Sequence, residues 1–294
     1  MPKTTEQSSL STLQARGLLL LAVLMWSSGG LFAKSPVFLA WPEDSRGVLL
    51  AFWRALFASL GLFPFLRRPS WSWNLVPMTL CFLAMNIAYL TAMTLTTSAN
   101  ATWLQNTSPT WVCLISWLVL REQPRRADLV LLTFGILGVA FILTFEIRGA
   151  SFTGVLIGLA GGLFYAGVVL FLRQLRGHSA VWLILLNHLV TATALLPVPI
   201  ALDIWPSGEQ LPWLAAFDIL QMGIPYVLFT RGLQIIPGGE ASSIALLEPI
   251  ILPLWVLLLW GEQPRWWTTV GGALILTGML YRYTPVAIAH LRRR

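Results

Sequence analysis

The sequence predicts an all-α polytopic membrane protein, and two observations carry this prediction: the composition and the length of the apolar runs. Of the 294 residues, 56% are hydrophobic and 11% are Asp, Glu, Lys or Arg, whereas soluble domains carry about 25% charged residues. So few charges cannot keep the surface of a globular protein polar. The composition therefore excludes a water-soluble fold.

Ten apolar runs are long enough to cross a bilayer as helices. A hydrocarbon core of about 30 Å needs roughly 20 helical residues, and the runs are too continuous for the alternating strands of a membrane barrel. We expect the first run to be a retained span, because it lacks the small-residue cleavage pattern of a signal peptide. The predicted spans are residues 16–33, 47–66, 73–95, 99–120, 127–146, 152–172, 180–201, 211–233, 240–260 and 267–285.

Lys and Arg are distributed unequally between alternate loops. One side of the membrane receives Lys3, Arg16, Arg67, Arg68, Arg121, Arg125, Arg126, Arg173, Arg176, Arg231, Arg282, Arg292, Arg293 and Arg294; the other receives Lys34, Arg46, Arg148 and Arg265. This excess of fourteen over four predicts that both termini lie in the cytoplasm. Because the basic residues stand in small groups between apolar runs, no nucleic-acid partner is expected.

The sequence repeats itself at a fixed offset. Residues 121–125 read Arg-Glu-Gln-Pro-Arg, and residues 261–265, which lie 140 positions later, read Gly-Glu-Gln-Pro-Arg. The same offset pairs Pro109 with Pro249. The repeat predicts two units of five spans, residues 1–148 and 149–294. Because five is odd, the second unit enters the membrane upside down, an arrangement that is typical of secondary transporters.

Several motifs, taken together, resemble a known family. They are Trp26-Ser27-Ser28-Gly29, Arg54 in the second span, Pro109 followed by an apolar run to Arg121-Glu122, and Leu247-Glu248-Pro249 followed by Trp260-Gly261-Glu262. The pattern covers essentially the whole chain and resembles the EamA-type members of the drug/metabolite transporter superfamily. Among these it is most similar to the YddG-type amino-acid exporters of Gram-negative inner membranes. The resemblance implies ten helices in two inverted repeats, export of small metabolites and a place in the bacterial inner membrane.

Three ionisable residues fall within predicted spans: Arg54, Asp218 and Glu248. A charge at bilayer depth costs at least about 2.5–3.5 kcal/mol, so such residues are candidates for function. Arg54 is expected either to clamp helices or to contact substrate. Glu248 has either a structural role or a role in proton coupling. Asp218, nearer the end of its span, is expected to be a solvated residue of a vestibule.

Pro109 and Pro249 occupy equivalent positions in the fourth and ninth spans. A proline inside a helix removes a backbone hydrogen bond and clashes with the preceding turn. We therefore expect paired kinks in two helices that cross near the centre of the molecule. The kinks either act as gates or shape a static cavity.

Aromatic and polar residues within the spans predict a mostly apolar cavity with a few hydrogen-bonding groups, which suits amphipathic amino acids. The candidates are Trp26, Ser27, Met78, Met85, Tyr89, Trp103, Asn106, Tyr165, His188 and Ser243. Ordinary helix packing is the alternative for each of them. The tryptophans at span ends are expected in interfacial belts: Trp41, Trp71, Trp73, Trp205, Trp213, Trp260, Trp266 and Trp267.

The sequence as a whole predicts a secondary transporter that exports small amphipathic metabolites, including aromatic amino acids, by alternating access. Export of drugs or other metabolites is the alternative. An intramembrane enzyme is disfavoured because no catalytic groups converge at helical spacing, and a channel because no span shows a continuous polar lining. The expected partners are a small-molecule substrate and the lipid bilayer. No cofactor or metal is expected, and the oligomeric state is left open, with a monomer as one possibility.

Overall fold

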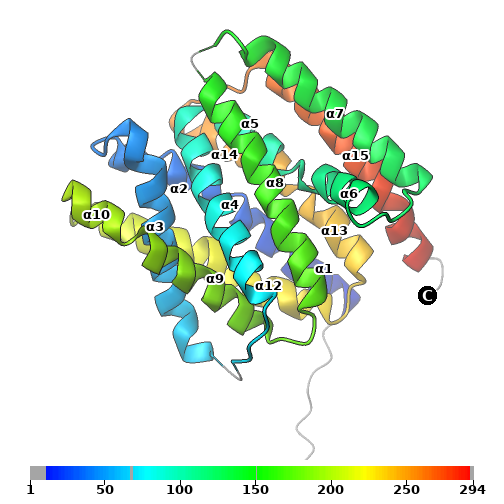
Figure 1. Ribbon diagram of the computed structural model, residues 1–294, viewed down its shortest axis with the longest axis horizontal. Coiled ribbons are helices and arrows are strands. Elements are labelled where there is room, and N and C mark those ends of the chain that lie inside the picture. The colour runs from blue at the N-terminus through cyan, green and yellow to red at the C-terminus, as the bar shows by residue number, and fades with distance from the viewer. Residues whose placement is uncertain (1–10, 67–68, 150, 292–294) are drawn as a thin grey trace, which may run out of the picture.

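The computed structural model describes residues 11–66, 69–149 and 151–291. This part of the chain folds entirely into helices joined by short connections (Figure 1), as the sequence predicts. Of the basic residues that predict the orientation, Lys3, Arg67, Arg68 and Arg292–Arg294 lie outside the described residues. The α-helices are α1 (Thr12–Trp26), α2 (Gly29–Ala33), α3 (Glu43–Leu62), α4 (Leu75–Leu95), α5 (Ser98–Gln105), α6 (Ser108–Leu118), α7 (Arg126–Glu146), α8 (Phe152–Gln174), α9 (Ala180–Leu195), α10 (Pro197–Leu202), α11 (Gln210–Asp218), α12 (Ile224–Leu233), α13 (Gly238–Ala245), α14 (Glu248–Trp260) and α15 (Trp266–Leu291).

Five of the ten predicted spans are interrupted. The first consists of α1 and α2, the fourth of α5 and α6, the seventh of α9 and α10, and the ninth of α13 and α14. In the eighth span, a π-helical segment, Ile219–Gly223, joins α11 to α12. Within the described residues, eight spans are long and apolar enough to cross a membrane. The other two predicted spans correspond to α5–α6, which carries several polar residues, and to α15.

The breaks in the fourth and ninth spans begin their second helices with a proline. Pro109 and Pro249 each lie in the first turn of the helix that follows the break. A proline is well tolerated there, because the N–H that it lacks would have no partner within the helix. The expected kinks at Pro109 and Pro249 therefore take the form of full interruptions.

The break in the first span was not expected from the sequence. The hydroxyl of Ser27 donates to the carbonyl oxygen of Leu24, and that of Ser28 to Met25. Gly29 follows, and a side chain there would overlap the amide of Gln221. The interruption therefore depends on a residue that lies far away in the sequence, in the π-helical segment.

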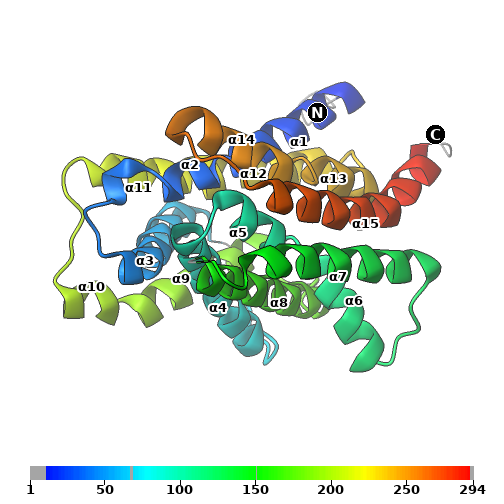
Figure 2. The ribbon, with the colours of Figure 1, turned by 90° about the horizontal axis from the view of Figure 1, so that it is seen from above.

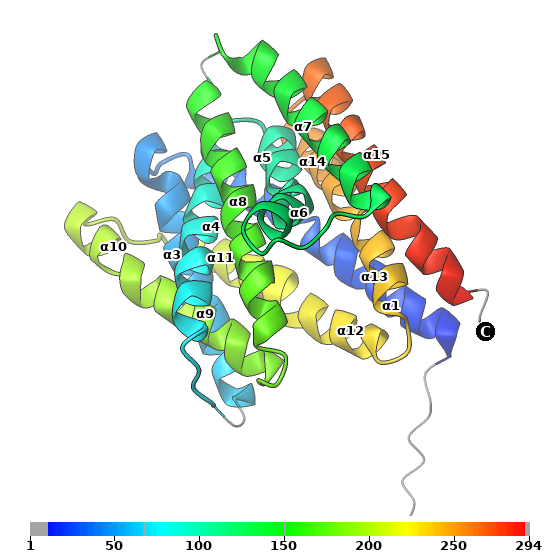
Figure 3. The ribbon, with the colours of Figure 1, turned by 45° about the vertical axis from the view of Figure 1, so that its right-hand side comes forward.

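The most extensive helix contacts join the two halves of the chain. They are α4 with α8, α7 with α15, α3 with α9 and α1 with α12, and α5 also packs on α14. In span numbers these pairs are 3–6, 5–10, 2–7, 1–8 and 4–9. Exchanging the two halves converts pair 3–6 into pair 8–1 and each of the other three pairs into itself, as two inverted repeats require. The fold is an all-α bundle of two inverted five-span repeats; Figure 3 shows α7 lying along α15.

The two ends of the bundle can be distinguished by what they hold. The start of α1 and the end of α15 lie near each other (Figure 2), and we call this side the termini end. The opposite side, the pocket end, holds a pocket that Lys34, Arg148 and Arg265 help to line. These three basic residues belong to the set of four that the sequence assigns to one side. Which end faces the cytoplasm stays a prediction.

The tryptophans at span ends differ in exposure, and Trp213, Trp260 and Trp267 are half-buried. Trp71, Trp73, Trp205 and Trp266 are exposed, as interfacial belts require. Trp41 is buried in the main hydrophobic core with α2, α3 and α4, so the prediction of a belt position is wrong for this residue. Trp260 and Trp267, which are half-buried, donate hydrogen bonds to the carbonyl oxygen of Leu31 and to Glu146. These two indoles stabilise contacts within the protein.

Candidate functional site

Arg54 is the centre of a polar network inside the bundle. It lies in α3, and 3% of its surface is exposed. Its Nη2 donates to Oδ1 of Asn86 at 2.6 Å and its Nη1 to Oε1 of Gln221 at 3.1 Å. The guanidinium also lies over the ring of Phe217, 5.5 Å from its centroid. Arg54 therefore connects α3 and α4 of the first repeat with the eighth span of the second.

Gln221 joins this network to the break in the first span. Its Nε2 donates to the carbonyl oxygen of Trp26 at 3.2 Å, where α1 ends and helical partners are missing. Gln221 lies in the π-helical segment, a type of irregularity that is often found at functional sites. One amide side chain thus connects a buried cation, an interrupted helix and a bulged helix.

A buried hydrogen-bond donor and a buried acceptor in this region have no hydrogen-bond partner. Among the described residues they include Nε of Arg54 and Oδ1 of Asp218. Arg54 interacts electrostatically with both Asp218 and Glu248. Asp218 is 4% exposed, so the prediction that it is a solvated vestibule residue is wrong. It ends α11 directly before the π-helical segment and is covered by α3 on the side of Gly61.

Glu248 begins α14 at the break in the ninth span, and its side chain is half-buried. Further along α14, the indole of Trp255 donates to Oγ of Ser27 at 3.0 Å. The break of the first span is therefore joined to the middle of α14 by a hydrogen bond between the repeats. In this region, unwound backbone and ionisable side chains from both halves lie together, as in the midplane sites of transporters with discontinuous helices.

Three of the predicted cavity residues lie within side-chain packing. Met78 is fully buried, and Trp103 covers Gly272 of α15 so closely that a side chain at position 272 would overlap the indole. His188 is 1% exposed and meets the ring of Phe82 edge-on, with centroids 5.0 Å apart. None of the three offers surface to a solute in this conformation.

Of the other predicted residues, some lie at helix breaks and some lie within continuous helices. Trp26 and Asn106 border two of the breaks and are half-buried. Ser243, also half-buried, lies in α13, and Tyr165 in α8 is 37% exposed. Met85 and Tyr89, which are buried, lie on α4 on either side of Asn86. Contact between these residues and a substrate stays a prediction.

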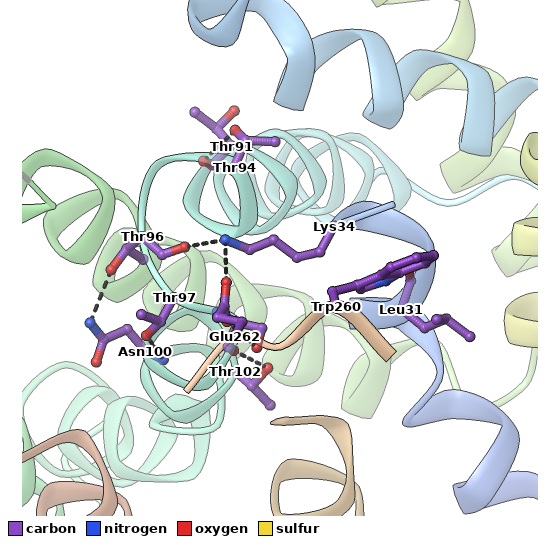
Figure 4. A network of polar contacts seen from close by, with 11 residues as sticks. Leu31, Lys34, Thr91, Thr94, Thr96, Thr97, Asn100, Thr102, Trp260 and Glu262 are labelled. Atoms are coloured by element: carbon purple, nitrogen blue, oxygen red, sulfur yellow. Dashed lines mark hydrogen bonds and ion pairs between the residues drawn. The ribbon is translucent and has the colours of Figure 1, made fainter. Parts of the chain in front are cut away.

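A second network lies at the pocket end (Figure 4). The Nζ of Lys34 lies 2.7 Å from Oε2 of Glu262 and also donates to the carbonyl oxygen of Thr96. The other oxygen of Glu262 accepts from the backbone N–H and the hydroxyl of Ser98, both at 2.6 Å. Glu262 belongs to the Glu-Gln-Pro loop after α14, so one carboxylate of the second repeat binds two segments of the first, the residue after α2 and the start of α5.

Glu146 forms a neighbouring network at the same end. Its Oε1 accepts from Asn100 at 2.9 Å and from Trp267 at 3.0 Å, and its Oε2 accepts from Ser151 at 2.7 Å. Asn100 in turn accepts from the hydroxyl of Thr268. The adjoining pocket has a volume of about 580 Å³ and is lined in part by Lys34, Arg148, Arg265, Glu146, Glu262 and Trp267.

Sequence reasoning missed Asn86 and Gln221, the two partners of Arg54. A signal was present, because both are amide side chains within long apolar runs, and polar residues in membrane helices usually bond to neighbouring helices. The aromatic residue beneath Arg54, Phe217, gave no such signal, since phenylalanine is common in every span.

Comparison with known proteins agrees with this architecture. The sequence matches the EamA-like transporter family twice, over residues 15–144 and 152–284. A solved crystal structure covers 94% of this chain and 99% of its own with a TM-score of 0.64; at 18% identity, this likeness shows a shared fold.

Several transporters are similar in sequence. An uncharacterized transporter of Archaeoglobus fulgidus is 29% identical over 66% of this chain and 70% of its own length. Human solute carrier family 35 member G1 is 24% identical, covering 87% and 74%, and the uncharacterized transporter YwfM of Bacillus subtilis is 27% identical, covering 73% and 75%. With both halves matched, the chain is a multi-pass membrane transporter, not an enzyme, and belongs to the EamA-like transporter family.

Proposed function

We propose that this transporter exports small amphipathic metabolites, namely amino acids including aromatic ones. The observation that carries the proposal is the set of Arg54, Asp218 and Glu248, which interact electrostatically at the seam between the repeats, next to the ring of Phe217. Arg54 has a donor without a hydrogen-bond partner, and Asp218 has an acceptor without one. Groups of opposite charge beside an apolar surface match the chemistry of a zwitterion with an aromatic side chain.

The charges of such a substrate need partners inside the membrane, because an unpaired charge in an apolar medium is costly. The substrate carboxylate would accept from Arg54, whose planar guanidinium suits a carboxylate. The substrate ammonium would donate to Glu248, which is half-buried and therefore the more accessible of the two acids. Phe217, whose ring centroid lies 5.5 Å from the guanidinium of Arg54, supplies aromatic surface beside these groups.

Transport would proceed by alternating access of this seam to the two ends. The interruptions at Pro109 and Pro249 give each repeat a helix whose two parts can move separately, and we assign them the role of gates. Substrate can shift the equilibrium between the two states only if the states bind it with different affinity. Contacts that span both repeats, such as those of Arg54, satisfy this condition because they change when the repeats move.

The orientation follows from the distribution of basic residues. We propose that both termini are cytoplasmic and that the chain resides in a bacterial inner membrane, because fourteen of the nineteen Lys and Arg residues fall on the side of the termini. Within the family, we propose a place among the YddG-type amino-acid exporters. The features that support it are the length of the chain and its Trp- and Tyr-rich spans.

Counterflow in liposomes tests the proposal. The purified protein is loaded with unlabelled amino acid inside the vesicles, and uptake of the labelled compound is followed for a panel of amino acids and drugs. We expect saturable counterflow of aromatic amino acids, its loss in Arg54→Met, and its retention in Arg46→Met, a matched change on the same helix outside the site. Counterflow of drugs alone would favour the alternative substrate class, and conduction without saturation would contradict a carrier.

A further inference from the structure

The two Glu-Gln-Pro loops, which the internal repeat makes equivalent, differ in their contacts. At the pocket end, Glu262 lies 2.7 Å from Lys34, and their side chains are 21% and 19% exposed. At the termini end, Glu122 lies 3.6 Å from Arg173, and these side chains are 52% and 45% exposed. One pair is close and sheltered, whereas the other is long and solvated.

The basic partners occupy corresponding places in the two repeats. Lys34 follows α2 directly and ends the first span of the first repeat. Arg173 lies in the last turn of α8, which is the first span of the second repeat. Glu122 and Glu262 lie 140 positions apart, at the offset of the repeat. The two ion pairs are therefore counterparts under the inverted symmetry of the fold.

Glu262 also binds the start of α5. The first N–H groups of a helix have no partner within it, and Glu262 accepts one of them from Ser98 together with the serine hydroxyl. Position 238, which corresponds to Ser98 in the second repeat, is a glycine and offers no hydroxyl. Two residues further on, Glu240 pairs instead with Arg16 of α1.

The difference in exposure determines which pair holds the present conformation. A solvated ion pair contributes little to stability, whereas a carboxylate that accepts several short hydrogen bonds contributes more. Glu122 and Arg173 therefore do little to fix the present arrangement. Glu262, with donors from Lys34 and Ser98, fixes the α2, α5 and α14–α15 segments to one another.

We propose that these pairs are two latches of one switch: Lys34–Glu262 holds the pocket end shut in this conformation, and Arg173–Glu122 tightens to shut the termini end in the alternative conformation. This inference rests on the proposed alternating access and names the contacts that select between its states. Loss of one latch should favour the state in which the other is closed.

Cysteine labelling tests the switch without any substrate. In a background with Cys81→Ala and Cys113→Ala, the reporter Thr102→Cys reacts with a membrane-impermeant maleimide. Thr102 is 1% exposed and lies one turn below Ser98, to whose carbonyl oxygen its hydroxyl donates. The reporter is therefore covered from the pocket end while the latch at that end is closed.

The two latches should act on this reporter in opposite directions. We expect Glu262→Gln to label about ten times faster, a shift of about 1.4 kcal/mol between the two states. Lys34→Met should act in the same direction while leaving the contact of Glu262 with Ser98. Arg173→Gln removes the other latch and should slow labelling of the reporter. The exposed control Glu43→Gln touches neither latch and should leave the labelling rate unchanged.

A second reporter keeps the test decisive if Thr102→Cys does not fold. Ser243→Cys, in α13 near the termini end, should label more slowly in Glu262→Gln and faster in Arg173→Gln. Equal effects of both latch variants on either reporter, or no effect of Glu262→Gln, would overturn the proposal. Failure of amino-acid counterflow with intact opposite labelling shifts would reject the substrate and leave the switch standing.

Discussion

The network around Arg54 predicts that removing its buried charge destabilises the protein less than removing a neutral partner of that charge. We compare Arg54→Met, which removes the buried cation, with Gln221→Leu, which removes its neutral partner. Arg54 makes two hydrogen bonds, to Asn86 and Gln221. Gln221 makes one to Arg54 and one to the carbonyl oxygen of Trp26. Each variant therefore loses two hydrogen bonds, and only the first removes a charge.

The magnitudes decide the order of the two variants. Arg54→Met loses two hydrogen bonds to a charged group at about 1.5 kcal/mol each, and it regains about 2.5–3.5 kcal/mol because no cation remains in the membrane. Its free energy of unfolding should stay within about 1 kcal/mol of the wild type. Gln221→Leu loses about 1.5 kcal/mol from the bond with Arg54 and about 0.6 kcal/mol from that with Trp26. It should therefore be destabilised by about 2 kcal/mol.

Reversible unfolding by SDS in mixed micelles measures both free energies. Leu220→Met, at an exposed position in the same π-helical segment, is the matched control and should resemble the wild type. Arg54→Met should be the more stable of the two network variants and yet inactive in counterflow. If Arg54→Met proves less stable than Gln221→Leu by more than about 1 kcal/mol, the cost assigned to the buried cation is wrong.

Three further predictions concern the seam and the pocket end. Gly138→Ala would place a Cβ 2.5 Å from the carbonyl oxygen of Gly271 where α7 packs on α15, and this overpacking should lower the free energy of unfolding in the SDS titration by about 1–3 kcal/mol. The control Gly17→Ala, whose Cβ would meet nothing within 4 Å, should be neutral. Equal losses of stability in both variants would contradict the close packing of α7 on α15. Asn100→Leu removes three side-chain hydrogen bonds and should lower the free energy of unfolding by about 2 kcal/mol, at about 0.6 kcal/mol for each bond. An unchanged midpoint of the SDS titration would show that this network does not stabilise the fold. Glu248→Gln should abolish the dependence of liposome flux on a pH gradient if this carboxyl carries the coupled proton, and a retained dependence would reject that role.

The sequence was sufficient to predict those features of the fold that depend on neighbouring residues. Apolar runs of helical length placed the ten spans, and the prolines at positions 109 and 249 placed two interruptions, since a proline acts on the turn that directly precedes it. The offset of 140 between the Glu-Gln-Pro loops and the odd number of spans per unit led to the inverted architecture. Each of these inferences needs only neighbouring residues or a comparison of the chain with itself.

Features that depend on distant partners were missed. The break after Trp26 depends on Gln221, which is 195 residues away. Residues 26–29 alone do not predict a contact with that residue. Asp218 lies near a span end, where solvent contact is the usual expectation, yet packing of α11 on α3 buries it. Met78 and Trp103 are buried in this conformation, and their contact with a substrate stays a prediction. The packing of the helices against one another determines which side of a helix faces a cavity. A single sequence does not contain enough information to predict that packing.

The pairing of spans across the two halves has a consequence for biosynthesis. Every one of the most extensive contacts joins a helix made early to one made late, and α7 must wait for α15. Five newly inserted helices therefore lack their largest partner surfaces, and Glu146 stays without its donor Trp267 until the last span arrives. A ribosome that stalls midway would leave an exposed set of helices in the membrane, an obvious target for a protease that removes unfinished chains. The two halves produced as separate polypeptides should still associate, because only residues 147–151 link α7 to α8 and the extensive contacts between the halves lie elsewhere.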